Sequence, residues 1–281
     1  MLHIVTDSST MYSVGEAQKQ GFDLAPLSVT IDNKTYKEYE EIRTPEFVEI
    51  IRQGHLPVSS QPSIGDVLEM YKRQPEGEIL NITMADGLSG TYNSACTAKT
   101  MLEKPERVTV WNSRTLCGPH RYMVLAAQKM AAAGKSLEEV LKRLEEYAAS
   151  SYSFLMPKDF DYLKRGGRLA PMVAEVGKIL HLVPIMTLTE DCKRLASFAK
   201  KRSFVKAVDC IVDFLVKKGV DAGHKIYVVH SEAHQLAVQA VERIRAKIAD
   251  ADIEILPLSP AFTTQGGPEC VAIQTIPKIG E

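Results

Sequence analysis

The sequence predicts an α/β protein with two domains. The N-terminal domain, residues 1–154, should contain a doubly wound, mostly parallel sheet, and residues 155–281 should form an α+β domain. A chain of 281 residues, 45% of them hydrophobic, is long enough for two domains that each have a core. In the first half, apolar runs alternate with amphipathic segments, which is the pattern of a parallel sheet with crossover helices. In the second half, two apolar runs flank the turn Glu190-Asp191 and indicate a hairpin beside helices.

The predicted elements of the first half follow from this alternation and from local turn and cap signals. Asp32-Asn33 predicts a hairpin turn, and Thr44 and Ser63 are predicted N-caps. The serine-rich segment 58–63 reads as a polar loop. Strands are expected at 3–6, within 22–31, at 35–36, 79–84 and 107–111, and helices at 13–20, 44–53, 64–74, 91–104, 119–133 and 136–150.

The second half carries a different mixture of elements. Gly166-Gly167 should end a helix that begins near Lys158, because glycine allows a positive φ. The helix expected at 171–182 is strongly apolar, and its stripe is either core or the wall of a cavity. That stripe contains Met172, Val173, Val176, Ile179 and Leu180. Further helices are expected at 203–218 and 234–248, and strands at 184–189, 194–199, 225–230, 253–258 and 271–276.

The turn from Asp86 to Thr91 is the strongest candidate for a binding site. It joins a predicted strand to a predicted helix, where unpaired backbone N–H groups and the helix dipole attract an anion. Ser89 and Thr91 place hydroxyls on both sides of Gly90, which lacks a Cβ. The alternative is that Ser89 is only an N-cap. In a parallel sheet, the loops that begin at Asp7 and Asn112 lie at the same edge and should meet this turn.

Composition and motifs exclude several classes of protein. A net charge of −1 and a pI of about 6.7 argue against nucleic-acid binding. Five scattered cysteines without a C-x-x-C pair indicate neither a disulfide framework nor a zinc site. Because no run of about 18 apolar residues occurs, we expect no stable membrane insertion and a cytoplasmic location. P-loop and G-x-G-x-x-G motifs for a nucleotide cofactor are also absent.

Two segments are similar to known catalytic or metal-binding motifs but do not have the required spacing or geometry. Gly87-Leu88-Ser89-Gly90 does not have the G-x-S-x-G spacing of a serine hydrolase. His230 should end a strand and His234 should begin a helix, so the pair lacks the geometry of an H-E-x-x-H metal site. A basic cluster could be a solvated face or a docking patch for a negatively charged partner. It consists of Lys193, Arg194, Lys200, Lys201, Arg202 and Lys206.

A set of motifs in family order resembles the DegV family of bacterial fatty acid-binding proteins. The motifs are Ile4-Val5-Thr6-Asp7-Ser8-Ser9, Ser59-Ser60-Gln61-Pro62-Ser63, Leu88-Ser89-Gly90-Thr91-Tyr92-Asn93-Ser94-Ala95 and Gly166-Gly167-Arg168, with Pro184 and Arg202 downstream. The resemblance implies a non-enzymatic carrier that holds one long-chain fatty acid in a tunnel near the domain boundary. It implies no cofactor, and a separate fatty acid kinase as the partner that phosphorylates the bound acid.

The resemblance also assigns residues. Ser59 and Ser89 would donate hydroxyls to the carboxylate, with Gly90 and Thr91 adding backbone N–H groups. Arg168 and Gln265 would lie near the head group. Within the basic cluster described above, Arg202 and Lys206 are the residues expected to dock a partner. Gln265 stands where the family usually has His, and Asn112 where many members have Asp.

Two other functions stay open, the first because of these departures. Glutamine cannot carry a proton as histidine can, so a storage or transport paralogue without kinase coupling is an alternative. A second alternative is an enzyme acting on a small phosphorylated or carboxylated metabolite, since the fold resembles that of dihydroxyacetone kinase-type domains.

Overall fold

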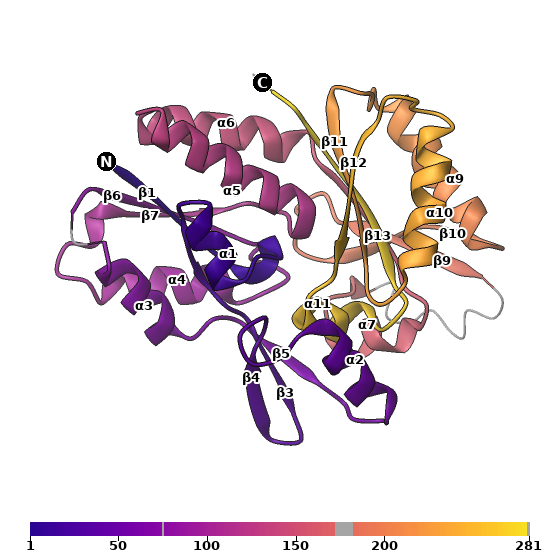
Figure 1. Ribbon diagram of the computed structural model, residues 1–281, viewed down its shortest axis with the longest axis horizontal. Coiled ribbons are helices and arrows are strands. Elements are labelled where there is room, and N and C mark those ends of the chain that lie inside the picture. The colour runs from indigo at the N-terminus through magenta and orange to yellow at the C-terminus, as the bar shows by residue number, and fades with distance from the viewer. Residues whose placement is uncertain (75, 172–181, 280–281) are drawn as a thin grey trace. The chain divides into compact units, whose positions relative to one another are not determined.

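The computed structural model describes residues 1–74, 76–171 and 182–279, which fold into two units (Figure 1). Met1–Ala149 and Ser259–Ala261 form the first unit, and Ser150–Leu258 and Phe262–Glu281 form the second. The predicted apolar stripe of the helix at 171–182 lies outside the described residues.

The first unit is built on a parallel sheet of four strands, as predicted. Their order is β2 (Asp23–Ala25), β1 (Leu2–Asp7), β6 (Glu78–Thr83) and β7 (Val108–Asn112). Two pairs of helices lie on opposite faces of this sheet (Figure 1), which is the doubly wound arrangement. These are α3 (Ile64–Lys72) with α4 (Thr91–Thr100), and α5 (Cys117–Ala132) with α6 (Leu137–Ala149).

Alternating strand residues make the core between the sheet and α3 and α4. Val5, Ile79 and Val108 project from three adjacent strands and are each at most 1% exposed. They pack with Val67, Met70 and Tyr71 of α3 and with Ala95 and Ala98 of α4. The remaining short helices of the unit are η1 (Ser8–Thr10), α1 (Val14–Lys19) and η2 (Pro105–Arg107).

A small antiparallel sheet extends the first unit. β3 (Ser28–Ile31) and β4 (Lys34–Lys37) form the predicted hairpin, and Asp32 and Asn33 take positive φ values of 49° and 66°. The loop predicted at 58–63 is wrong at its start, because β5 (Val58–Ser60) pairs with β3. Serine-rich composition indicates turns, but here the open edge of β3 supplies hydrogen-bond partners that local composition cannot reveal.

Of the two N-caps predicted in this region, one is confirmed and one is wrong. Ser63 caps α3 as expected, with its Oγ accepting a hydrogen bond from Asp66 N at 3.0 Å. Thr44 is not the cap of α2 (Thr44–Arg52); it is the first helical residue, and Arg43 occupies the cap position without a side-chain hydrogen bond.

The second unit contains a mixed sheet of six strands. Their order is β10 (Leu195–Lys201), β9 (Val183–Leu188), β8 (Tyr152–Met156), β13 (Val271–Pro277), β11 (His224–His230) and β12 (Asp252–Pro257). Only β11 and β12 pair in parallel; the other neighbours are antiparallel. This agrees with the predicted α+β class, although the sequence did not predict β8.

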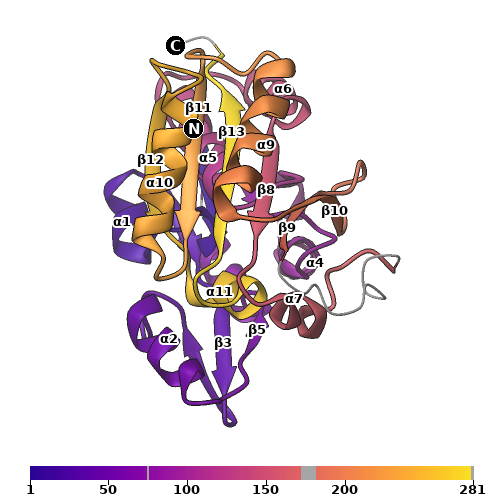
Figure 2. The same cartoon turned by 90° about the vertical axis from the view of Figure 1, so that its right-hand side faces the viewer.

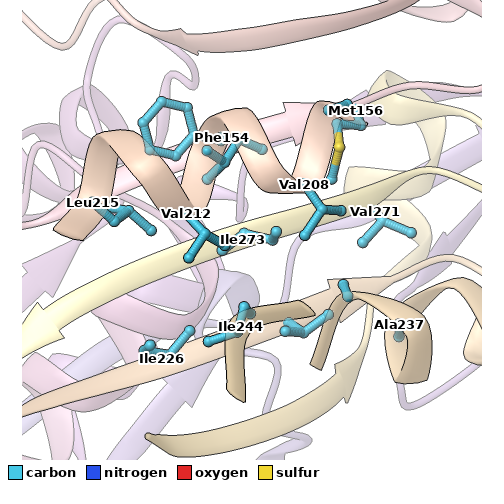
Figure 3. Close-up of a cluster of buried hydrophobic side chains, with 14 of the residues drawn as sticks. Phe154, Met156, Val208, Val212, Leu215, Ile226, Ala237, Ile244, Val271 and Ile273 are labelled. Carbon is cyan, nitrogen blue, oxygen red and sulfur yellow. The ribbon is translucent and has the colours of Figure 1, made fainter. Parts of the chain in front are cut away.

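Two amphipathic helices, α9 (Phe204–Lys217) and α10 (His234–Arg245), pack beside each other along this sheet (Figures 1 and 2). Figure 3 shows Val208, Val212 and Leu215 of α9 directed at the strand residues Phe154 and Ile273. All five are at most 2% exposed, so this cluster is the core of the unit.

Two short helices complete the unit. α7 (Phe160–Gly166) ends as predicted at Gly167, whose φ is 69°. α11 (Pro260–Gly266) begins on Pro260 and Ala261, which belong to the first unit, and was not predicted.

Candidate functional site

The turn between β6 and α4 brings two hydroxyls together. Ser89 Oγ lies 2.8 Å from Thr91 Oγ1, and Thr91 N donates to Ser89 Oγ at 3.3 Å. Gly90, rather than Ser89, is the N-cap of α4, and it supplies no side-chain cap. Ser89 Oγ therefore accepts from the first N–H of α4 although Ser89 precedes the cap residue, and the turn places two hydroxyls beside the start of the helix.

Gln61 connects this turn to the serine-rich segment. A Cβ built on Gly90 would lie 2.9 Å from Cδ, Oε1 and Nε2 of Gln61. The end of β5, which carries the half-buried Ser59, is thus packed against the start of α4 within the first unit. The sequence contained this Gln in a quoted motif, but nothing local indicated that it would contact Gly90.

Neighbouring loops support the turn, which confirms the predicted convergence at the carboxyl edge of the sheet. The Asp7 carboxylate accepts hydrogen bonds from Ser9 N at 2.9 Å and from Met84 N at 3.0 Å. Asn112 Oδ1 accepts from Asp86 N at 3.3 Å and from Arg114 N at 3.0 Å. An amide oxygen thus makes both bonds that an aspartate oxygen would make at this position.

Ser8 has a structural role in this network. Its Oγ accepts from Leu27 N and donates to the carboxylate of Glu38, which is 0% exposed. Burial raises the pKa of Glu38 to about 7, against the lowering effect of hydrogen bonds from Ser8, Ala261 and Ser259. The sequence did not indicate this buried carboxyl group, because Glu38 lies among other charged and polar residues.

His120 is a second buried titratable group that sequence reasoning missed. Its Nδ1 lies 2.6 Å from Ser9 Oγ, and its Nε2 lies 3.2 Å from Thr6 Oγ1 and 3.1 Å from the carbonyl of Ile82. Burial holds the pKa of His120 below its usual value, although Asp7 and the Ile82 carbonyl act in the opposite direction. With its ring, Ser9 and Thr6 each at most 1% exposed, His120 stabilises the loop after β1.

In the second unit, two of the predicted head-group residues lie around the end of α7. A Cβ on Gly166 would overlap Oε1 of Gln265, so glycine allows α11 to approach α7 here. Arg168 donates from Nη1 to the carbonyl of Gly166, and Arg194 donates to that of Gly167 at 2.8 Å. Burial, and then the charge of Arg194, lower the pKa of Arg168.

The predicted docking residues lie at the junction of β10 and α9. Arg202 and Lys206 are exposed, and Lys206 N donates to the cap residue Ser203 at 3.3 Å. Neither side chain makes an ion pair with any residue in the described ranges.

The histidine pair has the arrangement that the sequence indicated. His230 ends β11 and His234 begins α10, with their rings 5.6 Å apart and inclined at 66°. Among residues 1–74, 76–171 and 182–279, no three His, Cys, Asp or Glu side chains are grouped to hold a metal ion. In the same ranges, no helix is both long and apolar enough to cross a bilayer.

A cavity of about 420 Å³ also lies in the first unit. Ile79 and Val108 in its lining stand at the beginnings of β6 and β7, and Met101 and Leu102 follow α4. The Ser89 turn follows the opposite end of β6, so this cavity is separate from the hydroxyl pair.

Comparison with known proteins identifies the family. The family model described as "Uncharacterised protein, DegV family" matches residues 1–278. The chain belongs to the DegV family. A DegV domain-containing protein of Clostridium acetobutylicum is 31% identical over 276 residues, covering 96% of this chain and 95% of the relative.

Solved DegV structures have the same fold. A DegV family protein from Thermus thermophilus, described by its fatty acid binding, has a TM-score of 0.89 at 26% identity, covering 98% of this chain and 99% of its own. DegV from Bacillus subtilis, described as a fatty acid binding protein, has a TM-score of 0.86 at 26% identity, covering 99% of both chains. The mixed α/β fold predicted from the sequence is therefore that of DegV proteins.

Proposed function

We propose that this DegV protein is a non-enzymatic carrier that binds one long-chain fatty acid. The observation that carries the proposal is the hydroxyl pair of Ser89 and Thr91 at a helix start that has no side-chain cap. A carboxylate taken out of water must accept hydrogen bonds, or it takes up a proton instead. Fatty acid binding by the DegV proteins of Thermus thermophilus and Bacillus subtilis supports the same ligand class.

In this proposal, Ser59 and Ser89 donate their hydroxyls to the carboxylate, and the Gly90–Thr91 backbone adds N–H groups. The packing of Gln61 on Gly90 supports a common site for the two serine segments. A sixteen-carbon tail buried at ~0.8 kcal/mol per CH₂ contributes on the order of 12 kcal/mol before the costs of binding. The tail therefore supplies most of the affinity, and the hydroxyls select its orientation.

Lipid extraction and native mass spectrometry of the purified protein test this function. We expect one co-purifying fatty acid per chain. Protein that is empty and also does not bind added palmitate would refute the carrier function. Turnover of a small phosphorylated or carboxylated metabolite that is lost in Ser89→Ala would instead identify an enzyme.

The carboxylate site is tested by substitution. Ser59→Ala with Ser89→Ala should weaken palmitate binding by about 1 to 3 kcal/mol, because the carboxylate of palmitate loses two hydroxyl donors while the contacts of its tail remain. Ser60→Ala is the matched control, since alternate strand residues point to opposite faces. Equal affinity of the double variant and the control would place the head group elsewhere.

We further propose that the carrier presents its ligand to a separate fatty acid kinase, with Arg202 and Lys206 as docking cations. Their exposure and lack of ion pairs within the described residues support this assignment. Arg168 and Gln265 would lie near the head group. Gln265 cannot hold a proton near neutral pH as a histidine can. We therefore expect the bound acid to be phosphorylated slowly, and Gln265→His to make this phosphorylation faster.

An assay with ATP and a purified bacterial fatty acid kinase tests this coupling through the acyl phosphate formed. Arg202→Glu with Lys206→Glu should reduce acyl phosphate formation while palmitate binding stays unchanged. No acyl phosphate from either the natural chain or Gln265→His would favour a storage or transport role.

A further inference from the structure

Gln61 occupies an unusual position over the start of α4. Its amide atoms Cδ, Oε1 and Nε2 all lie 2.9 Å from the place that a Cβ on Gly90 would take. The three equal distances place that Cβ position over the face of the amide group. Gly90 has φ −75°, which any residue adopts. A Cβ at position 90 would therefore displace the Gln61 side chain, whereas the backbone conformation itself would accept any residue.

The exposed side chain of Gln61 extends from a fixed stretch of backbone. Ser60 is paired with Ser28 in the small sheet, and Ser63 caps α3, so the backbone is fixed on both sides of Gln61. Within residues 1–74, 76–171 and 182–279, the side chain of Gln61 makes no hydrogen bond. Its two N–H donors are thus available beside Gly90, which lies between Ser89 and Thr91 in the chain.

We propose that Gln61 donates a hydrogen bond to the ligand's carboxylate and selects it over an uncharged head group. The inference rests on the proposed fatty acid site and adds a specificity residue to it. A carboxylate only accepts hydrogen bonds, whereas an alcohol can also donate one. A site that offers the Gln61 amide N–H groups and the Ser89 hydroxyl as donors would therefore favour the carboxylate, and bonds to a charged acceptor are the stronger ones.

The first test compares palmitate with hexadecanol on the natural chain and on Gln61→Glu. This variant keeps the side-chain length but replaces both donors by a charged acceptor. We expect palmitate affinity to fall at least tenfold, as for loss of a hydrogen bond to a charged group, and hexadecanol affinity to change less than about twofold. Gln18→Glu on α1, also exposed, controls for the added negative charge.

The second test uses the packing on Gly90. Ala at 90 keeps an allowed backbone but pushes the Gln61 amide away, so Gly90→Ala should lose as much palmitate affinity as Gln61→Ala. Adding Gly90→Ala to Gln61→Ala should then cause no further loss. Melting temperatures of all variants verify that they fold.

The outcomes separate the two proposals. A natural chain that does not bind palmitate refutes the carrier function itself. Palmitate binding that is equal in the natural chain and Gln61→Glu, or an equal loss for palmitate and hexadecanol, overturns the role of Gln61 and leaves the carrier function standing.

Discussion

The carboxylate of Glu38 accepts a hydrogen bond from the backbone nitrogen of Ala261 at 2.9 Å, across 223 positions of sequence. Both residues belong to the first unit, because Ser259–Ala261 returns to it from the C-terminal part of the chain. Ala261 is the second residue of α11, where a backbone N–H has no partner within the helix. Glu38 satisfies that N–H from a distant strand end, so its charge affects how firmly this segment is held.

The first prediction concerns Glu38→Gln and pH. The pKa of Glu38 is raised from 4.5 to about 7, so between these values the folded chain keeps a proton that the unfolded chain has lost. The contribution of the protonated Glu38 side chain to the free energy of unfolding is complete below pH 4.5 and is lost as the pH rises through 7. We expect the melting temperature of the natural chain to fall more steeply than that of Glu38→Gln between about pH 5 and pH 8. Parallel curves would contradict the prediction.

The second prediction concerns His120 and has the opposite sign. Burial lowers the pKa of His120 from 6.5, so the unfolded chain takes up a proton before the folded chain does. This stabilisation is present above pH 6.5 and is lost as the pH falls toward the lowered value. Urea unfolding should show that acid weakens the natural chain more than His120→Gln, whose side chain does not titrate. A variant with equal acid sensitivity would exclude His120 as the cause.

The third prediction concerns a buried pair in the first unit. Asn81 Nδ2 donates to Tyr71 Oη at 2.6 Å, and the two residues are 2% and 1% exposed. Tyr71→Phe should reduce the free energy of unfolding by about 1 to 3 kcal/mol, because it leaves a buried amide donor unpaired. Adding Asn81→Leu should recover part of this loss, since both polar partners are then absent.

Fluorescence can follow this unit alone, because the single tryptophan, Trp111, lies on β7. Tyr36→Phe is the control, as its hydroxyl makes no hydrogen bond to the described residues. A loss as large in the control as in Tyr71→Phe would contradict the assignment.

The fourth prediction concerns the core of the second unit. Ile211 on α9 is 0% exposed in the cluster under the sheet. Ile211→Val should cost about 0.5 to 1.5 kcal/mol and Ile211→Ala about 2 to 5 kcal/mol, in proportion to the cavity created. Val216→Ala, on the same helix but 45% exposed, should change stability by about 0.5 kcal/mol or less. Urea unfolding followed by far-UV circular dichroism measures the free energy of unfolding of all three variants. If Ile211→Ala lost no more stability than Val216→Ala, the burial of Ile211 in this core would be contradicted.

The sequence was sufficient wherever a few neighbouring residues decide the structure. The Asp32-Asn33 turn, the Ser63 cap and the helix end at Gly167 were predicted because each depends on local dihedral angles and nearby hydrogen bonds. The alternation of strands and helices gave the parallel sheet, and that sheet brought the loops after β1, β6 and β7 together.

Only the tertiary structure decided the features that need a distant partner. Val58–Ser60 is a strand because β3 offers it an open edge, and Glu38 and His120 are buried because other segments cover them. Gln61 lies on Gly90 because two segments separated by a whole helix and strand meet there. Local sequence patterns do not predict such contacts, because the contacts stabilise the chain only after remote segments have packed together.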